Sequence, residues 1–103
     1  HLLRMEYDDV LQNLLAKVML CKIYYELDEW NALDNQLDSI QIYLRRKKVL
    51  GYHRDNGLSI VRHFRRLVAL NFSDATAVER FRQEVMAEPV LTEREWFLKK
   101  ADQ

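Results

Sequence analysis

Apolar residues recur every three or four positions along most of the chain, which is the pattern of amphipathic helices. The first helix is predicted over about residues 9–27, with Asp8 as its N-cap. Its apolar positions form a stripe of Leu11, Leu14, Leu15, Val18, Cys21 and Tyr25, widened by Val10, Met19, Leu20, Ile23 and Tyr24. A helix this apolar packs on more than one side, so we expect it at the centre of the structure.

A second helix is predicted over about residues 29–48. Its buried stripe is Leu33, Leu37, Ile40 and Leu44, and its wet face is Asp34, Asp38, Gln41 and Arg45. Because the junction between the first two helices is short, they should form an antiparallel hairpin. The connector over residues 49–56 contains Gly51, which is expected at a turn or a helix C-cap.

Three further helices complete the pattern. The third is predicted over about residues 57–70, with Tyr52 as an alternative start and with Ile60, Val61, Phe64, Leu67 and Val68 facing inward. Ser73 or Asp74 should cap the fourth helix, which runs to about residue 87 with the apolar edge Val78, Phe81, Val85 and Met86, and Pro89 prevents its continuation.

The last helix is short. The capping-box pattern of residues 92–95 should open it, and it carries Trp96 and Phe97. With five helices and no convincing strand, the predicted class is all-α, in one domain over residues 1–103.

The first hairpin resembles a tetratricopeptide repeat, whose first helix carries W-x₂-L-G-x₂-Y, followed by A-x₃-F and a closing proline. Leu20, Cys21 and Tyr24 match the first motif, and Leu33 and Leu37 fall at the second. The chain departs from the pattern at three places, with Lys17 for tryptophan, Leu33 for alanine and Arg45 for proline. The second hairpin repeats A-x₃-F at Ala77 and Phe81, 44 residues after Leu33 instead of about 34.

The resemblance implies antiparallel hairpins stacked as an α-α superhelix. The chain as a whole also resembles the C-terminal helical region of large bacterial repeat proteins of uncharacterised function. It begins His-Leu-Leu without methionine, so we interpret it as a C-terminal fragment of a longer protein. A targeting signal would then lie in the missing part. The single cysteine excludes an internal disulfide and fits a reducing compartment, which favours a cytoplasmic location, and no apolar run is long enough for a membrane span.

Charge is distributed unevenly although the formal net charge is zero. Residues 43–66 hold eight basic side chains and one acidic side chain, Asp55. The cations that could form a basic strip for nucleic acid or another anion are Arg45, Arg46, Lys47, Lys48, Arg62, Arg65 and Arg66. The first four lie in the last turn of the predicted second helix, where cations offset the helix dipole without any ligand. We favour the interpretation that these cations stabilise the end of the helix over the interpretation that they bind an anion.

The residues offer little for catalysis. Cys21 lies among apolar residues with no histidine nearby in sequence, and His53 and His63 lack a second histidine or cysteine at metal-ligand spacing. We therefore expect no enzyme activity, no metal and no cofactor. Trp96 and Phe97, on a short terminal helix, are candidates for contact with a partner.

The favoured prediction is a non-catalytic helical-repeat module for protein–protein interaction or scaffolding. The alternative is an accessory nucleic-acid or anion-binding domain that uses the basic strip. Because the first helix is apolar nearly all round, the fragment is also predicted to self-associate through it, at a surface that includes Val10, Leu14 and Ile23.

Overall fold

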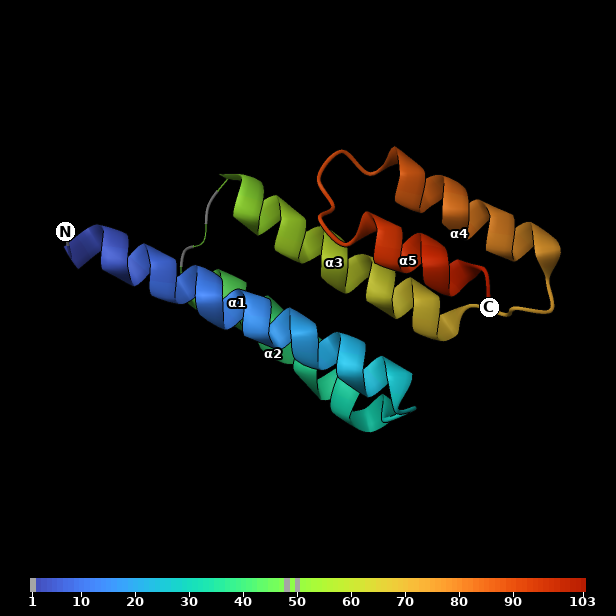
Figure 1. Ribbon diagram of the computed structural model, residues 1–103, viewed down its shortest axis with the longest axis horizontal. Helices are drawn as coiled ribbons and strands as arrows, with labels where there is room; N and C mark the ends of the chain where they lie inside the picture. The colour runs from blue at the N-terminus through green and yellow to red at the C-terminus, as the bar shows by residue number, and fades with distance from the viewer. Residues whose placement is uncertain (1, 48, 50) are drawn as a thin grey trace.

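The computed structural model describes the backbone of residues 2–47, 49 and 51–103, and the side chains of these residues from Asp8 onward. They form five helices and no strand (Figure 1). The helices are α1 (Leu2–Glu26), α2 (Trp30–Arg46), α3 (Gly51–Ala69), α4 (Ala75–Ala87) and α5 (Arg94–Ala101). The predicted all-α class with five helices is confirmed.

Successive helices run in alternating directions, so that α1 and α2 form one antiparallel hairpin and α4 and α5 form another (Figure 1). α3 lies between the two hairpins and contacts all four other helices. The expectation that the first helix is central is therefore wrong. The central helix is α3, which has a continuous buried side, whereas α1 keeps one side in solvent.

The core joins the two hairpins through aromatic residues. Phe64 of α3 and Phe97 of α5 are fully buried, with ring centroids 4.9 Å apart at 74°. The Trp96 ring packs against both, with its centroid 5.1 Å from that of Phe64 at a tilt and 5.3 Å from that of Phe97, and it makes an edge contact with Tyr25 of α1 at 5.6 Å. Such edge and tilted contacts add to the free energy gained by burying these large rings. This cluster fixes α5 against both α1 and α3.

The stripe predicted for the second helix is confirmed, since Leu33, Leu37, Ile40 and Leu44 are all buried. Two inward predictions on other helices are wrong. Val68 is 45% exposed near the end of α3, and Met86 is 59% exposed on α4. Both lie beside buried positions, on the solvent-facing side of their helices.

Two helix starts lie earlier than predicted. α1 begins at Leu2, so Asp8 lies inside the helix and is not its N-cap. α3 begins at Gly51, close to the alternative start at Tyr52 and well before Gly57, so most of the predicted connector is helical. Gly51 has φ +61°, a turn conformation that glycine adopts without strain. Gly57 is inside α3, where a Cβ would approach Leu44 Cδ1 of α2 to 2.8 Å. This glycine allows close helix packing and does not mark a helix end.

The ends of α4 and α5 are held by side chains. Asp74 is the N-cap of α4, accepting hydrogen bonds from the backbone N–H groups of Thr76 and Ala77. The capping box predicted for α5 is absent, because its N-cap, Glu93, makes no side-chain capping bond. Thr92 instead accepts a hydrogen bond from Asn56 Nδ2 of α3 (3.0 Å) and donates its N–H to Asn56 Oδ1 (2.8 Å). Thr92 therefore connects the segment before α5 to α3 and does not cap α5.

Candidate partner-binding surface

The three arginines predicted for the basic strip on α3 are each paired with carboxylates. Arg65 donates to Asp34 Oδ1 (2.9 Å) and Asp38 Oδ1 (2.7 Å), both on α2. On the other side of α3, Arg62 pairs with Glu88 and Arg66 with Glu84. These cations therefore connect α3 to its neighbours, and their charge is compensated within the chain.

The remaining cations of the strip lie elsewhere. Arg45, Arg46 and Lys47 are exposed at the C-terminal end of α2, and Lys48 lies outside the described residues. Because α2 and α3 are antiparallel, this end of α2 lies beside the first turn of α3, which contains Arg54. Arg65 is eleven residues further along α3, a rise of about 16 Å. Among the described residues of the predicted strip, the arginines of α3 are paired with carboxylates, and those at the end of α2 form no ion pair with a described side chain.

Trp96 and Phe97 are used inside the molecule. Phe97 is fully buried, and Trp96 is half-buried between Tyr25 and Phe64. Lys22 of α1 and Lys100 of α5 lie 6.0 Å and 5.5 Å from the centroid of the Trp96 ring. The prediction of a partner contact at Phe97 is wrong, because the short helix docks on its own core.

The largest group of exposed apolar side chains lies on α1. We call it the α1 apolar surface and define it as Leu15, Ala16, Met19, Leu20, Ile23 and Leu27. Its five large side chains are between 38% and 65% exposed. The opposite side of α1 carries the buried residues Leu14, Val18, Cys21 and Tyr25. One side of the helix thus packs on α2 and α3, and the other has no partner in the described chain.

The spacing within this surface is informative. Ala16, Leu20, Ile23 and Leu27 follow one another at intervals of four, three and four residues. This is the alternation of a helix–helix seam of the coiled-coil type. From Leu15 to Leu27 the surface covers about 18 Å of helix, or three turns. A contiguous apolar surface with polar ends marks an interaction site more often than scattered exposed residues do.

Both ends of the α1 apolar surface are acidic. Asp8 and Asp9 are exposed at one end, and Asp28 and Glu29 are exposed at the other. None of the four forms an ion pair with a residue whose side chain is described. Within the part of the chain whose side chains are described, these four are exposed acids that flank the surface.

The lysines of the described part of α1 point away from this surface. Lys17 donates to Ser39 Oγ of α2 (3.1 Å) and lies 5.3 Å from the centroid of the Tyr43 ring. Lys22 pairs with Glu93, just before α5, at 2.7 Å. Both cations are occupied by neighbouring elements, so the field over the apolar surface is set by the acids at its ends.

The sequence predicts Val10 and Leu14 on a self-association surface, but neither belongs to the α1 apolar surface. Leu14 is buried, and Val10 is half-buried where its carbonyl accepts a hydrogen bond from the Tyr43 hydroxyl (3.4 Å). Ile23 is 44% exposed and does belong to the α1 apolar surface. The four-three-four spacing was readable from the sequence, but it identifies the surface only once the opposite stripe is known to be the buried one.

Cys21 and His63 are buried titratable groups of the core. Burial raises the pKa of the Cys21 thiol to about 12, against a small opposing effect of Lys17, so the sulfur stays protonated. His63 is buried, and with Nε2 protonated it donates to Glu88 Oε1 at 2.9 Å. Its Nδ1 has no hydrogen-bond partner among the described residues. Burial lowers the pKa of His63 more than Glu88 raises it.

Glu88 is held ionised beside this histidine. Burial would raise the pKa of Glu88, but hydrogen bonds from Arg62 and His63 outweigh that effect and lower it. The pair connects α3 to the segment that follows α4, and the imidazole is too enclosed to meet a substrate. Over the described residues, no three His, Cys, Asp or Glu side chains gather closely enough to hold a metal ion.

Comparison of the chain with protein families, with curated proteins and with solved structures gave no significant match. Among the described helices, none has the length and hydrophobicity needed to cross a bilayer.

Proposed function

We propose that this chain is a non-catalytic helical module that binds a partner protein through the α1 apolar surface. In this proposal the hairpin of α1 and α2 is followed by a second one, formed by α3 and α4, in the manner of successive tetratricopeptide repeats. The observation that carries the proposal is the exposure of five large apolar side chains along three turns of α1. Burying the exposed half of each side chain contributes about 1 kcal/mol, or about 5 kcal/mol in all before the costs of association.

The partner we propose is a basic amphipathic helix. The seam spacing of Ala16, Leu20, Ile23 and Leu27 suits another helix, whose apolar residues would pack between these side chains. Acids at both ends favour lysine or arginine on the partner at matching positions. A second copy of the chain is disfavoured, because any two-fold contact along α1 brings the acidic ends of one copy near those of the other.

A designed peptide provides the probe. It is a helix with leucine at the seam positions and lysine on its flanks, and its counterpart has glutamate in place of every lysine. Titration calorimetry should show binding of the lysine peptide that weakens with added salt, and much weaker binding of the glutamate peptide. Equal binding of the two peptides would contradict the electrostatic part of the proposal.

The chain offers matched variants for this test. The double variant Met19→Gln/Ile23→Gln changes two residues of the α1 apolar surface, which are 54% and 44% exposed. The control Met86→Gln/Ile42→Gln changes the same residue types at 59% and 44% exposure on α4 and α2. The first should weaken peptide binding about 30-fold, from the loss of about 2 kcal/mol. The control should leave it unchanged.

Two other results would favour a different partner or a different function. A chain that dimerises, and that the double variant converts to a monomer, would make a second copy the occupant and overturn the proposed partner. Nucleic-acid binding that survives the double variant and is lost on replacing Arg45, Arg46 and Lys47 would favour an anion-binding function instead.

A further inference from the structure

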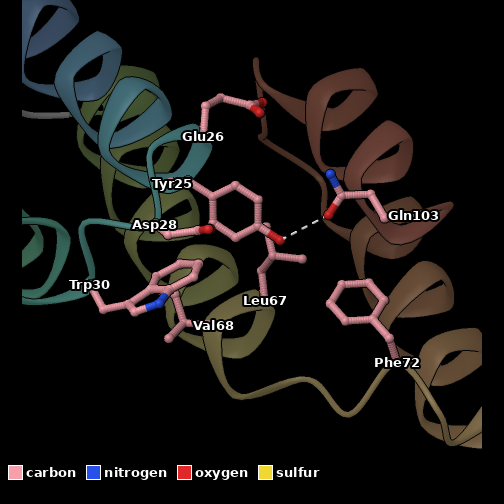
Figure 2. A pocket seen from close by; sticks show the side chains of 8 residues that line it. All are labelled: Tyr25, Glu26, Asp28, Trp30, Leu67, Val68, Phe72 and Gln103. Carbon is pink, nitrogen blue, oxygen red and sulfur yellow. Dashed lines mark hydrogen bonds between the residues drawn. The ribbon is translucent and has the colours of Figure 1, made fainter.

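A cavity of about 300 Å³ lies at one end of the molecule, separate from the α1 apolar surface. It is formed where the α1–α2 turn, the end of α3, the α3–α4 connection and Gln103 come together (Figure 2). We call it the Trp30 pocket. Its volume is at the lower end of the range for small-molecule sites.

Aromatic rings dominate the walls of this pocket. Trp30 and Phe72 stand on opposite sides of it, with Leu67 and Val68 between them (Figure 2). Both rings are partly exposed, Trp30 by 46% and Phe72 by 39%. Tyr25 lies behind them, with its ring 5.5 Å from that of Trp30 in an edge contact. Two large aromatic surfaces are thus left open to a ligand.

The charge in the pocket is negative. Of its two carboxylates, Glu26 pairs with Lys100 of α5, whereas Asp28 is exposed and forms no ion pair with a described side chain. The Tyr25 hydroxyl donates to Gln103 Oε1 at 3.3 Å. Burial and the charges of Glu26 and Asp28 raise the pKa of Tyr25, so this hydroxyl stays neutral. No Lys, Arg or His belongs to the residues that line the pocket.

Asp28 ends α1 in a left-handed backbone conformation. The Glu29 N–H donates to the Tyr24 carbonyl (2.9 Å) and the Asp28 N–H to the Tyr25 carbonyl (3.2 Å), which is the pair of bonds of a Schellman motif. Asp28 occupies the left-handed position of this motif, with φ +58°. Glycine is the usual residue there, because a Cβ is strained. A carboxylate is present where backbone geometry alone would favour glycine.

We propose that the Trp30 pocket binds an organic cation of the methylated-ammonium class, held between the rings of Trp30 and Phe72 with Asp28 as its counter-ion. Aromatic rings attract such cations through their negative faces, and a methylated ammonium loses less hydration than a bare one when it enters an apolar site. This inference goes beyond the proposed function and does not depend on it. The cation comes either from a free ligand or from a methylated lysine of a peptide.

Choline and its neutral isostere 3,3-dimethylbutanol are the probes, because they have nearly the same shape and differ in charge. Two-dimensional NMR of the full chain should show choline shifting the Trp30 indole and Phe72 signals, while the neutral isostere binds at least tenfold more weakly. Equal binding of the two, or no shift with either, would overturn the proposal.

Two substitutions at one position separate charge from stability. Asp28→Asn keeps the side-chain size and should weaken choline binding about fivefold. Asp28→Gly should weaken it at least as much while raising Tm, because the left-handed strain is relieved. A merely structural Asp28 would leave choline binding unchanged in the Asn variant, and this result would contradict the assignment.

A second arm identifies the source of the cation. Tighter binding of a trimethyl-lysine peptide than of choline would support the pocket and assign it to a modified protein, and equal binding would support it and assign it to a free ligand. The Met19→Gln/Ile23→Gln variant should bind choline normally, and Phe72→Leu, which removes one ring of the pocket and lies outside the α1 apolar surface, should bind the helical lysine peptide normally. Failure of the pocket is therefore distinguishable from failure of the α1 apolar surface.

Discussion

Neighbouring residues on α2 have opposite environments, and substitutions at them should differ greatly in their cost to stability. Leu37 is 2% exposed in the core, whereas the Asp38 side chain is exposed and pairs with Arg65 at 2.7 Å. Leu37→Asp buries an unpaired charge and should lower the free energy of unfolding by several kcal/mol. Asp38→Leu removes one exposed ion pair and should cost no more than about 1 kcal/mol. Urea unfolding measures both, and equal losses would show that α2 is rotated about its axis.

The buried histidine predicts how stability depends on pH. Burial lowers the pKa of His63 in the folded chain below its ordinary value of 6.5. The unfolded chain therefore takes up a proton first, and stability that is complete above pH 6.5 is lost as the pH falls through the folded pKa. One such proton gives a slope of at most about 1.4 kcal/mol per pH unit.

His63→Gln isolates this contribution, because the glutamine amide can still donate to Glu88. Between pH 6.5 and pH 5 the free energy of unfolding of the wild-type chain should fall more steeply than that of the variant. The measurement stays above pH 5 because the lowered pKa of Glu88 adds acid sensitivity of the same sign at lower pH. Parallel pH profiles of the two proteins would rule out His63 as the source.

At the scale of single elements, the N-terminus of α4 separates two residues that the sequence treats as equivalent. Asp74 accepts two backbone N–H groups of α4, and Ser73 uses its own N–H to donate to Asn71 Oδ1. Asp74→Ala should therefore cost about 1 kcal/mol of stability. Ser73→Ala should change it by less than about 0.5 kcal/mol. Thermal unfolding compares them, and a larger loss for Ser73→Ala would place the cap one residue earlier.

How far the sequence predicted each element depends on whether local pattern or tertiary contact decides it. The stripe of α2 was correct because four apolar residues at helical spacing leave one side to bury. The start of α1 was missed because Asp8 and Asp9 have the composition of a cap, while the hydrogen-bonded helix simply continues through them. Gly57 was read as the start of a helix, and only its contact with Leu44 explains why it lies inside one.

The candidate site was predictable only in part for the same reason. The basic strip followed from composition, but the carboxylates that pair with Arg62, Arg65 and Arg66 lie 18 to 31 residues away in sequence. Local pattern does not reveal such partners. The sequence shows that α1 is apolar on more than one side. It does not show which side stays in solvent, because that depends on where α2 and α3 pack. Asp28 was visible in the sequence only as one of the acids at the junction of the first two helices, where capping explains them.

At the scale of the whole molecule, α3 determines where charge is compensated. It carries the ion pairs to α2 on one side and to α4 and its following segment on the other, which compensates the basic charge of the middle of the sequence. Four exposed acids, Asp8, Asp9, Asp28 and Glu29, flank the α1 apolar surface. The α1 apolar surface, on the hairpin of α1 and α2, is therefore flanked by acids, and this arrangement suits the basic helical partner that we propose.

The most direct test of this account is methyl NMR of the chain during titration with the leucine–lysine helical peptide. The account predicts that the methyl signals of Leu15, Met19, Leu20, Ile23 and Leu27 shift and saturate together, while those of Ile42 and Met86 stay in place. Shifts centred on Ile42 or Met86, or shifts of equal size over all exposed methyl groups, would contradict the assignment of α1 as the binding surface.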